Sequence, residues 1–215
     1  ITTRLVGSEM CIRDRFYMVF GTFINIVMTL LCAYPLSRKE FTARNKVAMF
    51  FVFTMYFSGG MVPSFMLVNA LGLVDTIWAM LIPGAMSTYN MIIARTYMIN
   101  SIPDELYEAA EIDGCTPLQT FFKVVFPILK PTTVTVAILE AMWVWNDYLL
   151  PSLVLNINKY KTIPIAIQFL KQSHGQIDWG AMMAVLVLAI LPIIIFYIAC
   201  QKYIIEGVLA GAVKG

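Results

Sequence analysis

The chain has 215 residues, of which 60% are hydrophobic and 13% are charged, and its formal net charge is +2. Soluble domains are about 45–50% apolar and about 25% charged, so this composition excludes an ordinary soluble domain and favours an integral membrane protein. The Lys and Arg residues stand in short clusters between apolar runs rather than along one face, and we expect no nucleic-acid partner.

The first fifteen residues differ from the rest of the chain. They are polar, lack periodicity and adjoin an apolar run abruptly, and the string from Gly7 to Arg15 resembles a translated sequencing-adapter remnant. We therefore expect residues 1–15 to be a non-native leader, with a genuine polar loop as the alternative. The remaining residues, 16–215, are expected to form one transmembrane domain.

Long charge-free runs predict five membrane-spanning helices. Four of the runs hold 22, 28, 19 and 23 uncharged residues, and about 20 residues are enough to cross a hydrocarbon core roughly 30 Å thick. The alternative, core helices of a soluble α-protein, is disfavoured because such helices seldom lack charge for so long. Ser58-Gly59-Gly60 predicts a break in the second span, and Pro83 and Pro192 predict kinks in the third and fifth. The predicted spans are 16–37, 47–68, 75–95, 131–151 and 181–202.

The distribution of positive charge predicts the orientation of these spans. If the 38–46 loop lies inside, nine Lys and Arg residues lie inside and three lie outside, the leader not being counted. The 96–130 loop and the C-terminus are then cytoplasmic, and the first span begins outside. A chain that begins outside and holds five spans is expected to lack a first helix that enters from the cytoplasm.

The 96–130 loop is predicted to contain two short helices around a glycine hinge. We expect Ser101 to cap the first helix, with Asp104 three residues later and Pro103 in the first turn. Gly114 is expected to end this helix in a left-handed conformation. Because Ala109 and Ala110 are small, the first helix offers a surface that another protein could approach closely. The alternative is an ordered connector that only joins two spans.

The second short helix is predicted from a similar set of signals. Thr116 is expected to cap it, Pro117 to take the first helical position and Gln119 the third. We expect Pro127 and Pro131 to stop this helix and to lead into the fourth span.

The spacing of residues in this loop resembles a family pattern. Glu108-Ala109-Ala110, three residues, Gly114, nine residues and Val124-Val125-Phe126-Pro127 resemble the EAA loop of binding-protein-dependent ABC importer permeases, which more usually have Ile and Leu in place of Val124 and Phe126. The resemblance implies that the loop docks on an ATPase subunit, and that ATP-driven closure rocks the helices between two states. Carried over by position, the coupling residues are Glu108, Ala109, Ala110, Asp113, Gly114 and Pro127.

The resemblance extends over residues 16–215. Residues 33–38, 57–63 and 201–203 look like stretches of carbohydrate-type permeases, including a subgroup for complex oligosaccharides such as aldouronates. The resemblance implies an all-α integral membrane protein with the type I ABC importer permease fold (MetI-like), in which five of six expected helices are visible. It also implies a bacterial plasma (inner) membrane location and four kinds of partner: a second permease, an ATPase dimer, an extracytoplasmic solute-binding protein and the lipid bilayer.

The fourth span carries acids where the membrane makes them costly. Glu140 is expected near its middle, at a cost of about 2.5–3.5 kcal/mol on insertion scales, and Asp147 near its outer end. Because aromatic faces and polar groups together suit sugars, we expect this helix to line the translocation path. The alternative is that the acids bond to neighbouring helices or to the partner permease, and that the tryptophans are interface anchors. The path residues predicted are Glu140, Trp143, Asn146 and Asp147.

Residues that carry catalytic or metal chemistry are few and scattered. The four cysteines form no CxxC pair, and the one histidine, His174, stands in a polar connection. No P-loop, dinucleotide-binding or HExxH motif occurs. We therefore expect no catalytic residue, no metal site and no cofactor in this chain, with ATP bound and hydrolysed by the partner subunit.

Two other transport functions stay open on the sequence. One is an ABC importer permease for a non-sugar solute, such as an amino acid, a peptide or a metal. The other is an ion-coupled secondary transporter, which would more usually show inverted repeats and broken helices at the midplane. Retention of an ATPase subunit in a pull-down would separate an importer permease from a secondary transporter.

Overall fold

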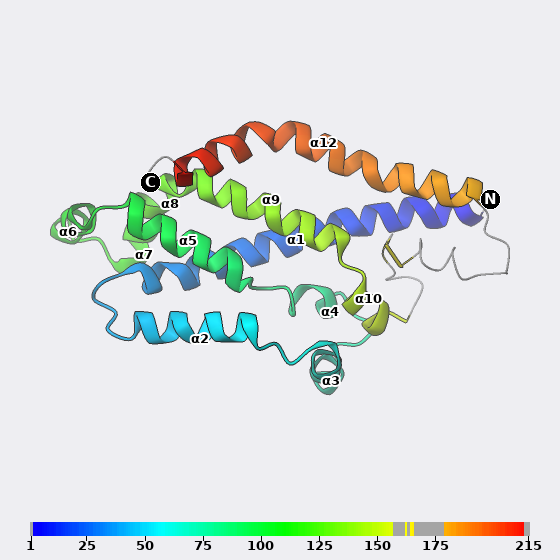
Figure 1. Cartoon of the computed structure of the whole chain (residues 1–215), viewed down its shortest axis with the longest axis horizontal. Coiled ribbons are helices and arrows are strands. Elements are labelled where there is room, and N and C mark those ends of the chain that lie inside the picture. Colours follow the sequence, from blue (N-terminus) through cyan, green and yellow to red (C-terminus); the bar gives the residue numbers. More distant parts are fainter. Residues whose placement is uncertain (1, 157–161, 163, 166–178, 213–215) are drawn as a thin grey trace. The chain divides into compact units, whose positions relative to one another are not determined.

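The computed structural model describes residues 2–156, 162, 164–165 and 179–212, and the elements assigned there are all helical (Figure 1). The chain divides into two compact units, and α1, α9 and α12 each contribute to both. The first unit comprises residues 1–24, 59–85 and 140–201. The second unit comprises residues 25–58, 86–139 and 202–215.

Helix α1 is a single helix of 36 residues, Thr2–Ser37. It contains the predicted first span and continues back through the residues expected to be a leader, whose origin stays a prediction. Its stretch Ile12–Ser37 is the one continuous helix in the described residues that is long and apolar enough to cross a membrane.

The second predicted span is broken where the glycines stand, as expected. Helices α2 (Arg44–Tyr56) and α3 (Met61–Ala70) meet at an angle of 110°. Gly60 at the break has φ +83°, in the left-handed region that residues with a Cβ disfavour. The apolar run is therefore long enough to span, but it is not one straight helix.

The third predicted span, 75–95, is wrong as a continuous helix. The structure has a single turn, α4 (Trp78–Leu81), and then a longer helix, α5 (Thr88–Ser101). Pro83 stands between them, where it supplies no backbone N–H and its ring opposes a continuing helix. The Ser87 side chain then accepts a hydrogen bond from the backbone N–H of Asn90 and starts α5.

The last two predicted spans also differ from the structure in their bounds. Helix α9 (Lys130–Asn146) ends before the predicted limit and is followed by α10 (Leu149–Val154). Helix α12 (Trp179–Ala212) is longer than its predicted span and contains Pro192. Counting each sharply bent pair of helices as one span gives up to three spans in the described residues. Five continuous spans are therefore not confirmed.

The first unit has a small apolar core around α3, α4 and α10. Its buried members are Val68, Ala79, Val154 and Leu155. Asp75 ties the segment before α4 to the end of α10, since its backbone N–H donates to the carbonyl of Val154 at 2.9 Å. The Asp75 carboxylate also accepts a hydrogen bond from the backbone N–H of Asn156, at 2.5 Å.

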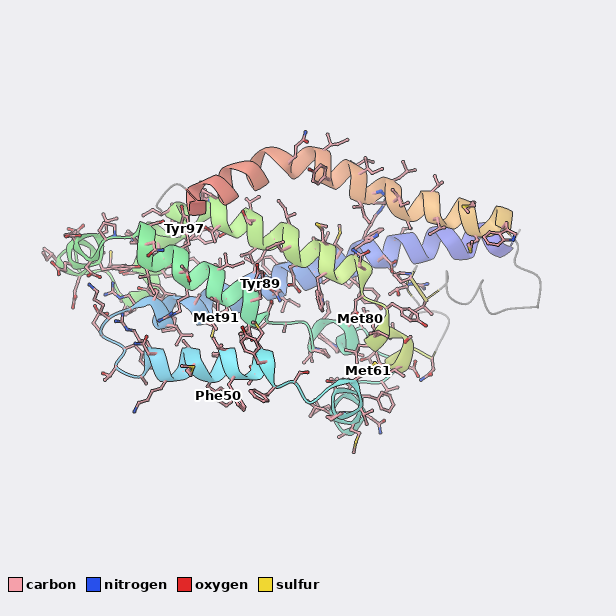
Figure 2. All side chains as sticks on the ribbon, in the orientation of Figure 1. Phe50, Met61, Met80, Tyr89, Met91 and Tyr97 are labelled. Atoms are coloured by element: carbon pink, nitrogen blue, oxygen red, sulfur yellow. The ribbon has the colours of Figure 1, made fainter. Side chains whose placement is uncertain are left out.

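The second unit has the larger core, in which α2 lies beside α5 (Figure 1). Figure 2 labels Met91 on α5 and Phe50 on α2. Met91 is fully buried, whereas Phe50 is 64% exposed. An exposed aromatic ring of this kind suits lipid or a partner chain better than water. The core of this unit consists of Leu30, Ala33, Leu36, Met91, Ala94, Met98, Ile102, Tyr107, Phe121, Val125 and Leu129.

Candidate functional site

The predicted pair of short helices is present in the second unit. Helix α6 (Asp104–Ile112) is followed by Gly114 with φ +74°, and then by α7 (Pro117–Thr120). The left-handed conformation at Gly114 is the one predicted for the hinge. We call residues 104–120 the hairpin.

The start of α7 follows its sequence signals closely. Thr116 Oγ1 accepts from the backbone N–H of Gln119 at 3.4 Å, and Gln119 Oε1 accepts from the backbone N–H of Thr116 at 2.9 Å. The predicted cap at Thr116 and the predicted place of Pro117 at the first helical position are confirmed, and the two bonds together form a reciprocal capping box. Two backbone donors at the turn are thereby satisfied without help from another chain.

The cap predicted for α6 is wrong. Ser101 is the last residue of α5, and the N-cap of α6 is Pro103, which makes no side-chain capping bond. The reason is the restriction that a proline places on the residue before it. Ile102 is driven into an extended conformation, with φ −117° and ψ 103°, so α5 has to end before it.

Helix α7 is not stopped at Pro127 as predicted. It continues through a π-helical segment, Phe121–Val125, into α8 (Phe126–Ile128), which contains Pro127. The backbone N–H of Phe126 bonds to the carbonyl of Phe121, five residues back. A wider turn of this kind gives the proline ring room that a regular helical turn would not. The sharp bend of 81° comes at Leu129, between α8 and α9, ahead of Pro131.

The two alanines of the hairpin do not share a surface. Ala110 is 5% exposed and packs inward on the same side of α6 as Tyr107, which is 6% exposed. Ala109 and Glu108 are exposed, as are Asp113 and Gly114. The predicted small-residue surface is therefore formed by Ala109 alone, while Ala110 lets α6 sit close to its own unit.

The most exposed apolar side chains of this region were missed by sequence reasoning. Ile112, at the end of α6, is 87% exposed, Leu118 on α7 is 63% exposed, and Phe122 in the π-helical segment is 59% exposed. Large apolar side chains that are exposed on the surface of a chain are typical of a site that another protein covers. For Ile112, the available signal in the sequence was an apolar residue outside the face of α6 that carries Tyr107 and Ala110.

The root of the hairpin is fixed to the end of α1. Lys39 forms an ion pair with Asp104 at the first residue of α6. The guanidinium carbon of Arg38 lies 3.7 Å from the centroid of the Tyr107 ring, a cation–π contact. Burial raises the pKa of the Tyr107 phenol, and the charge of Arg38 opposes this shift. The hairpin therefore has a fixed base and an exposed tip.

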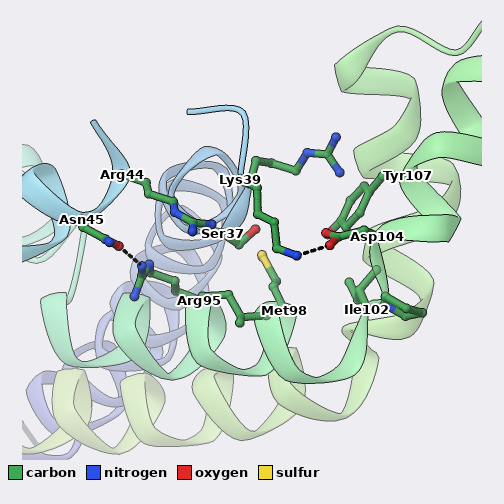
Figure 3. A pocket seen from close by; sticks show the side chains of 12 residues that line it. Ser37, Lys39, Arg44, Asn45, Arg95, Met98, Ile102, Asp104 and Tyr107 are labelled. Carbon is green, nitrogen blue, oxygen red and sulfur yellow. Dashed lines mark hydrogen bonds and ion pairs between the residues drawn. The ribbon is translucent and has the colours of Figure 1, made fainter. Parts of the chain in front are cut away.

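A pocket of about 210 Å³ lies beside this root (Figure 3). Arg95 of α5 enters it, with its Nε donating to the carbonyl of Leu36 at 2.9 Å and one Nη donating to Asn45 Oδ1 at 3.1 Å. Sequence reasoning counted Arg95 only as an inner positive charge. Its bonds show that it also closes the carboxyl end of α1.

The predicted path residues are only partly brought together. Glu140 is 4% exposed, while Trp143, three residues later on α9, is 72% exposed. Asp147 lies beyond the end of α9, so helical spacing no longer relates it to Glu140. Asn146, the last residue of the helix, is exposed and donates from its amide to the carbonyl of Met142 at 2.7 Å. The four residues therefore differ in exposure, and only three of them lie on α9.

The family of this chain follows from its sequence. The family described as the binding-protein-dependent transport system inner membrane component matches residues 13–209. The chain belongs to this family. It is thus a membrane component of a transport system, and the predicted resemblance is confirmed.

Relatives of this inner membrane component carry transport names. This chain is 38% identical over 214 residues to the polygalacturonan/rhamnogalacturonan transport system permease protein YtcP of Bacillus subtilis. The match covers 93% of this chain and 74% of the relative. This chain is 32% identical over 194 residues to the arabinooligosaccharides transport system permease protein AraQ of Halalkalibacterium halodurans, covering 89% of this chain and 69% of the relative.

A solved structure supports the fold of this inner membrane component. A chain from the crystal structure of a bacterial ABC transporter involved in the import of the acidic polysaccharide alginate matches it with a TM-score of 0.84 and 29% identity. The match covers 92% of this chain and 75% of that chain. The predicted all-helical importer permease fold is therefore confirmed, apart from the number of spans.

Two further observations concern side chains within this inner membrane component. Asn25 and Thr29 are fully buried inside α1, and Thr29 Oγ1 donates to Asn25 Oδ1 at 3.1 Å. This polar pair in the apolar stretch was missed, although its spacing of four residues was readable. Within the described residues, no group of three or more His, Cys, Asp or Glu side chains could hold a metal ion.

Proposed function

We propose that this chain is the permease subunit of an ABC importer for sugars or oligosaccharides. It would form the translocation path with a second permease and respond to ATP bound and hydrolysed by a partner ATPase dimer. An extracytoplasmic solute-binding protein would deliver the solute. Catalysis and nucleotide binding would thus lie outside this chain, in agreement with a family of membrane transport components.

The hairpin is the observation that carries this proposal. Its base is held to Arg38 and Lys39, which directly follow α1, by a cation–π contact and an ion pair. Ile112 at the far end of α6 is 87% exposed. A fixed base transmits force, and an exposed apolar tip provides contact with a partner. The proposed coupling residues remain Glu108, Ala109, Ala110, Asp113, Gly114 and Pro127. Of these, we assign direct contact with the ATPase to the exposed ones and a packing role to Ala110.

The proposed substrate class rests on the relatives. The two relatives described above are named for polygalacturonan or rhamnogalacturonan and for arabinooligosaccharides, and the structural neighbour belongs to an importer of alginate. These compounds are all carbohydrates of more than one sugar unit. We therefore favour an oligosaccharide over an amino acid, a peptide or a metal.

The proposed topology keeps the predicted orientation. The hairpin and the C-terminus would face the cytoplasm of a bacterial cell. The bent pair α2–α3 would cross as one broken span, and α9 would cross after the sharp bend at Leu129. Broken helices are tolerated in membranes where neighbouring protein satisfies the freed backbone groups. With α1, the α4–α5 region and α12, this gives the five proposed spans.

The proposed translocation path includes Glu140, Trp143 and Asn146 of α9 and Asp147 just beyond its end. Glu140 is buried within the chain. Because an acid inside a membrane protein is costly, its presence there favours a functional role. Trp143 is exposed on the same helix and could meet a sugar ring or the second permease. If Trp143 contacts the sugar, its substitution would change uptake or sugar preference. If Trp143 contacts the second permease, its substitution would change assembly.

Co-purification of the complete importer tests the coupling role. Replacing Ile112 by Glu places a charge on a side chain that contacts little of its own chain, so the permease should still fold. The variant should lose most of its ATPase subunit in a pull-down, whereas the apolar control Ile112→Leu should retain it. Full retention by I112E, with normal uptake, would contradict the proposed docking.

Uptake assays of the same importer separate the substrate classes. Cells or proteoliposomes that contain the complete transporter should accumulate labelled oligosaccharide in an ATP-dependent manner. Accumulation of an amino acid, a peptide or a metal instead would leave the permease function intact and replace the sugar. Uptake that follows an ion gradient and needs no ATP would overturn the importer proposal itself.

A further inference from the structure

The pocket at the root of the hairpin has an unusual charge balance. Four of its lining residues are basic and one is acidic. Asp104 is that acid, and it is already paired with Lys39. The four basic residues are Arg38, Lys39, Arg44 and Arg95.

The two arginines on the other side of the pocket have no acid between them. Figure 3 shows the guanidinium groups of Arg44 and Arg95 near each other beside Asn45. The guanidinium of Arg95 donates hydrogen bonds to two neutral acceptors, the carbonyl oxygen of Leu36 and Oδ1 of Asn45. In the described part of the chain, the Arg44 guanidinium makes neither a hydrogen bond nor an ion pair. Like charges held this close favour the arrival of an anion.

Part of the remaining wall of the pocket is apolar, beside Ser37 and Tyr107. Met98, Ile99 and Ile102 of the α5 region line it, and Ile99 is 46% exposed. The pocket also stands where α1, the helix long enough to span a membrane, comes to its end at Ser37. A ligand there would meet cationic groups on one side and apolar side chains on the other.

We propose that this pocket binds the phosphate of an anionic phospholipid headgroup, with Arg44 and Arg95 as the charged contacts. Arginine is well suited to this, because its planar fork can donate two parallel hydrogen bonds to phosphate oxygens. Basic pockets between helices at the membrane surface are a recurring form of lipid recognition. A volume of about 210 Å³ is well above the roughly 10–15 Å³ that a single water needs, which leaves room for a phosphate with part of its headgroup.

The test uses the complete importer in detergent, stripped of lipid and titrated while bound lipid is counted by native mass spectrometry. Phosphatidylglycerol should bind about tenfold more tightly than phosphatidylcholine. Arg44→Gln should lose this preference, and Arg44→Lys should recover part of it. Lys46→Gln is the matched control, since it removes the same charge from the same helix at an exposed position outside the pocket.

A second arm identifies the source of the phosphate. Millimolar inorganic phosphate or glycerol 3-phosphate should compete weakly with phosphatidylglycerol if the apolar wall contributes. Full competition by inorganic phosphate, abolished in R44Q, would keep the phosphate site and replace the lipid by a soluble anion. Equal binding of both lipids by the wild type, or equal loss in R44Q and K46Q, would overturn the proposal. Should R44Q fail to assemble, the comparison of the two lipids on the wild type still decides.

Discussion

The guanidinium of Arg95 donates to the carbonyl oxygen of Leu36 at 2.9 Å, although the two residues are 59 positions apart in the chain. Leu36 stands in the last turn of α1, where carbonyl groups lack a partner within the helix. A cation near these carbonyls satisfies one of them and also complements the helix dipole. Arg95 thereby joins α5 to the end of α1.

Replacing Arg95 by Met should destabilise the second unit by about 1–3 kcal/mol, because the carbonyl of the buried Leu36 and the side-chain oxygen of Asn45 both lose their partner. Thermal unfolding of the purified importer measures this loss. Arg95→Lys is the control, since it keeps the charge but loses the fork, and it should fall between Met and the wild type. An R95M variant as stable as the wild type would show that water replaces the guanidinium at no cost.

Tyr107 should make the hairpin sensitive to strongly alkaline pH. Because burial raises the pKa of its phenol in the folded chain, the folded state holds this proton more tightly than the unfolded state. The associated stability is complete below the unfolded pKa of about 10 and is lost as the pH rises through the folded pKa. Melting curves at pH 8 and above pH 10 should therefore show a larger drop for the wild type than for Tyr107→Phe. Parallel curves for the two proteins would contradict this.

Gly114 should tolerate only residues that accept a left-handed backbone. An added Cβ would meet no atom within 4 Å, so any effect of substitution comes from the φ of +74° rather than from a clash. Gly114→Val should raise the energy of the hinge by about 1–2 kcal/mol or more and lower ATPase retention. Gly114→Asn should keep most of it, because Asn adopts this conformation more readily. If both variants retain the ATPase equally, the hinge conformation is not needed for coupling.

Substitutions in α9 should separate a path role from an assembly role. Glu140→Gln keeps the size of a buried side chain and removes its charge, so the complex should still assemble while uptake or sugar preference changes. Trp143→Ala removes an exposed ring and should leave the fold of this chain intact. The readouts are co-purification of the second permease and competition between sugars in uptake. Lost assembly with an unchanged sugar preference would assign these residues to the interface instead.

Local signals were sufficient to predict the hinge and the second helix of the hairpin. Gly114 and the Thr116–Gln119 box act over four residues or fewer, and nothing in the fold opposes them. The cap predicted at Ser101 is wrong because a competing local rule applies: Pro103 restricts the residue before it to an extended conformation, so α5 ends at Ser101. Both outcomes were therefore decided by backbone chemistry that the sequence displays.

Features set by packing were harder to predict. Ala110 faces inward because Tyr107, three residues earlier, is drawn into the core of the second unit. The fourth span was predicted to run to residue 151, but α9 ends at Asn146, a boundary that charge-free runs do not mark. A run of apolar residues shows that a segment avoids water, but not whether it crosses straight or in two bent pieces.

The π-helical segment Phe121–Val125 has a consequence for comparing this chain with its relatives. Each residue of a regular helix advances the side-chain direction by about 100°, so one additional residue per turn changes the azimuth of everything downstream. A relative that lacks the wide turn would present a different side of α8 at the same aligned position. Deleting one residue from this segment should therefore convert the π-helical turn to a regular α-helical turn and leave the following side chains in place. The same deletion within α9 would instead rotate every side chain that follows it.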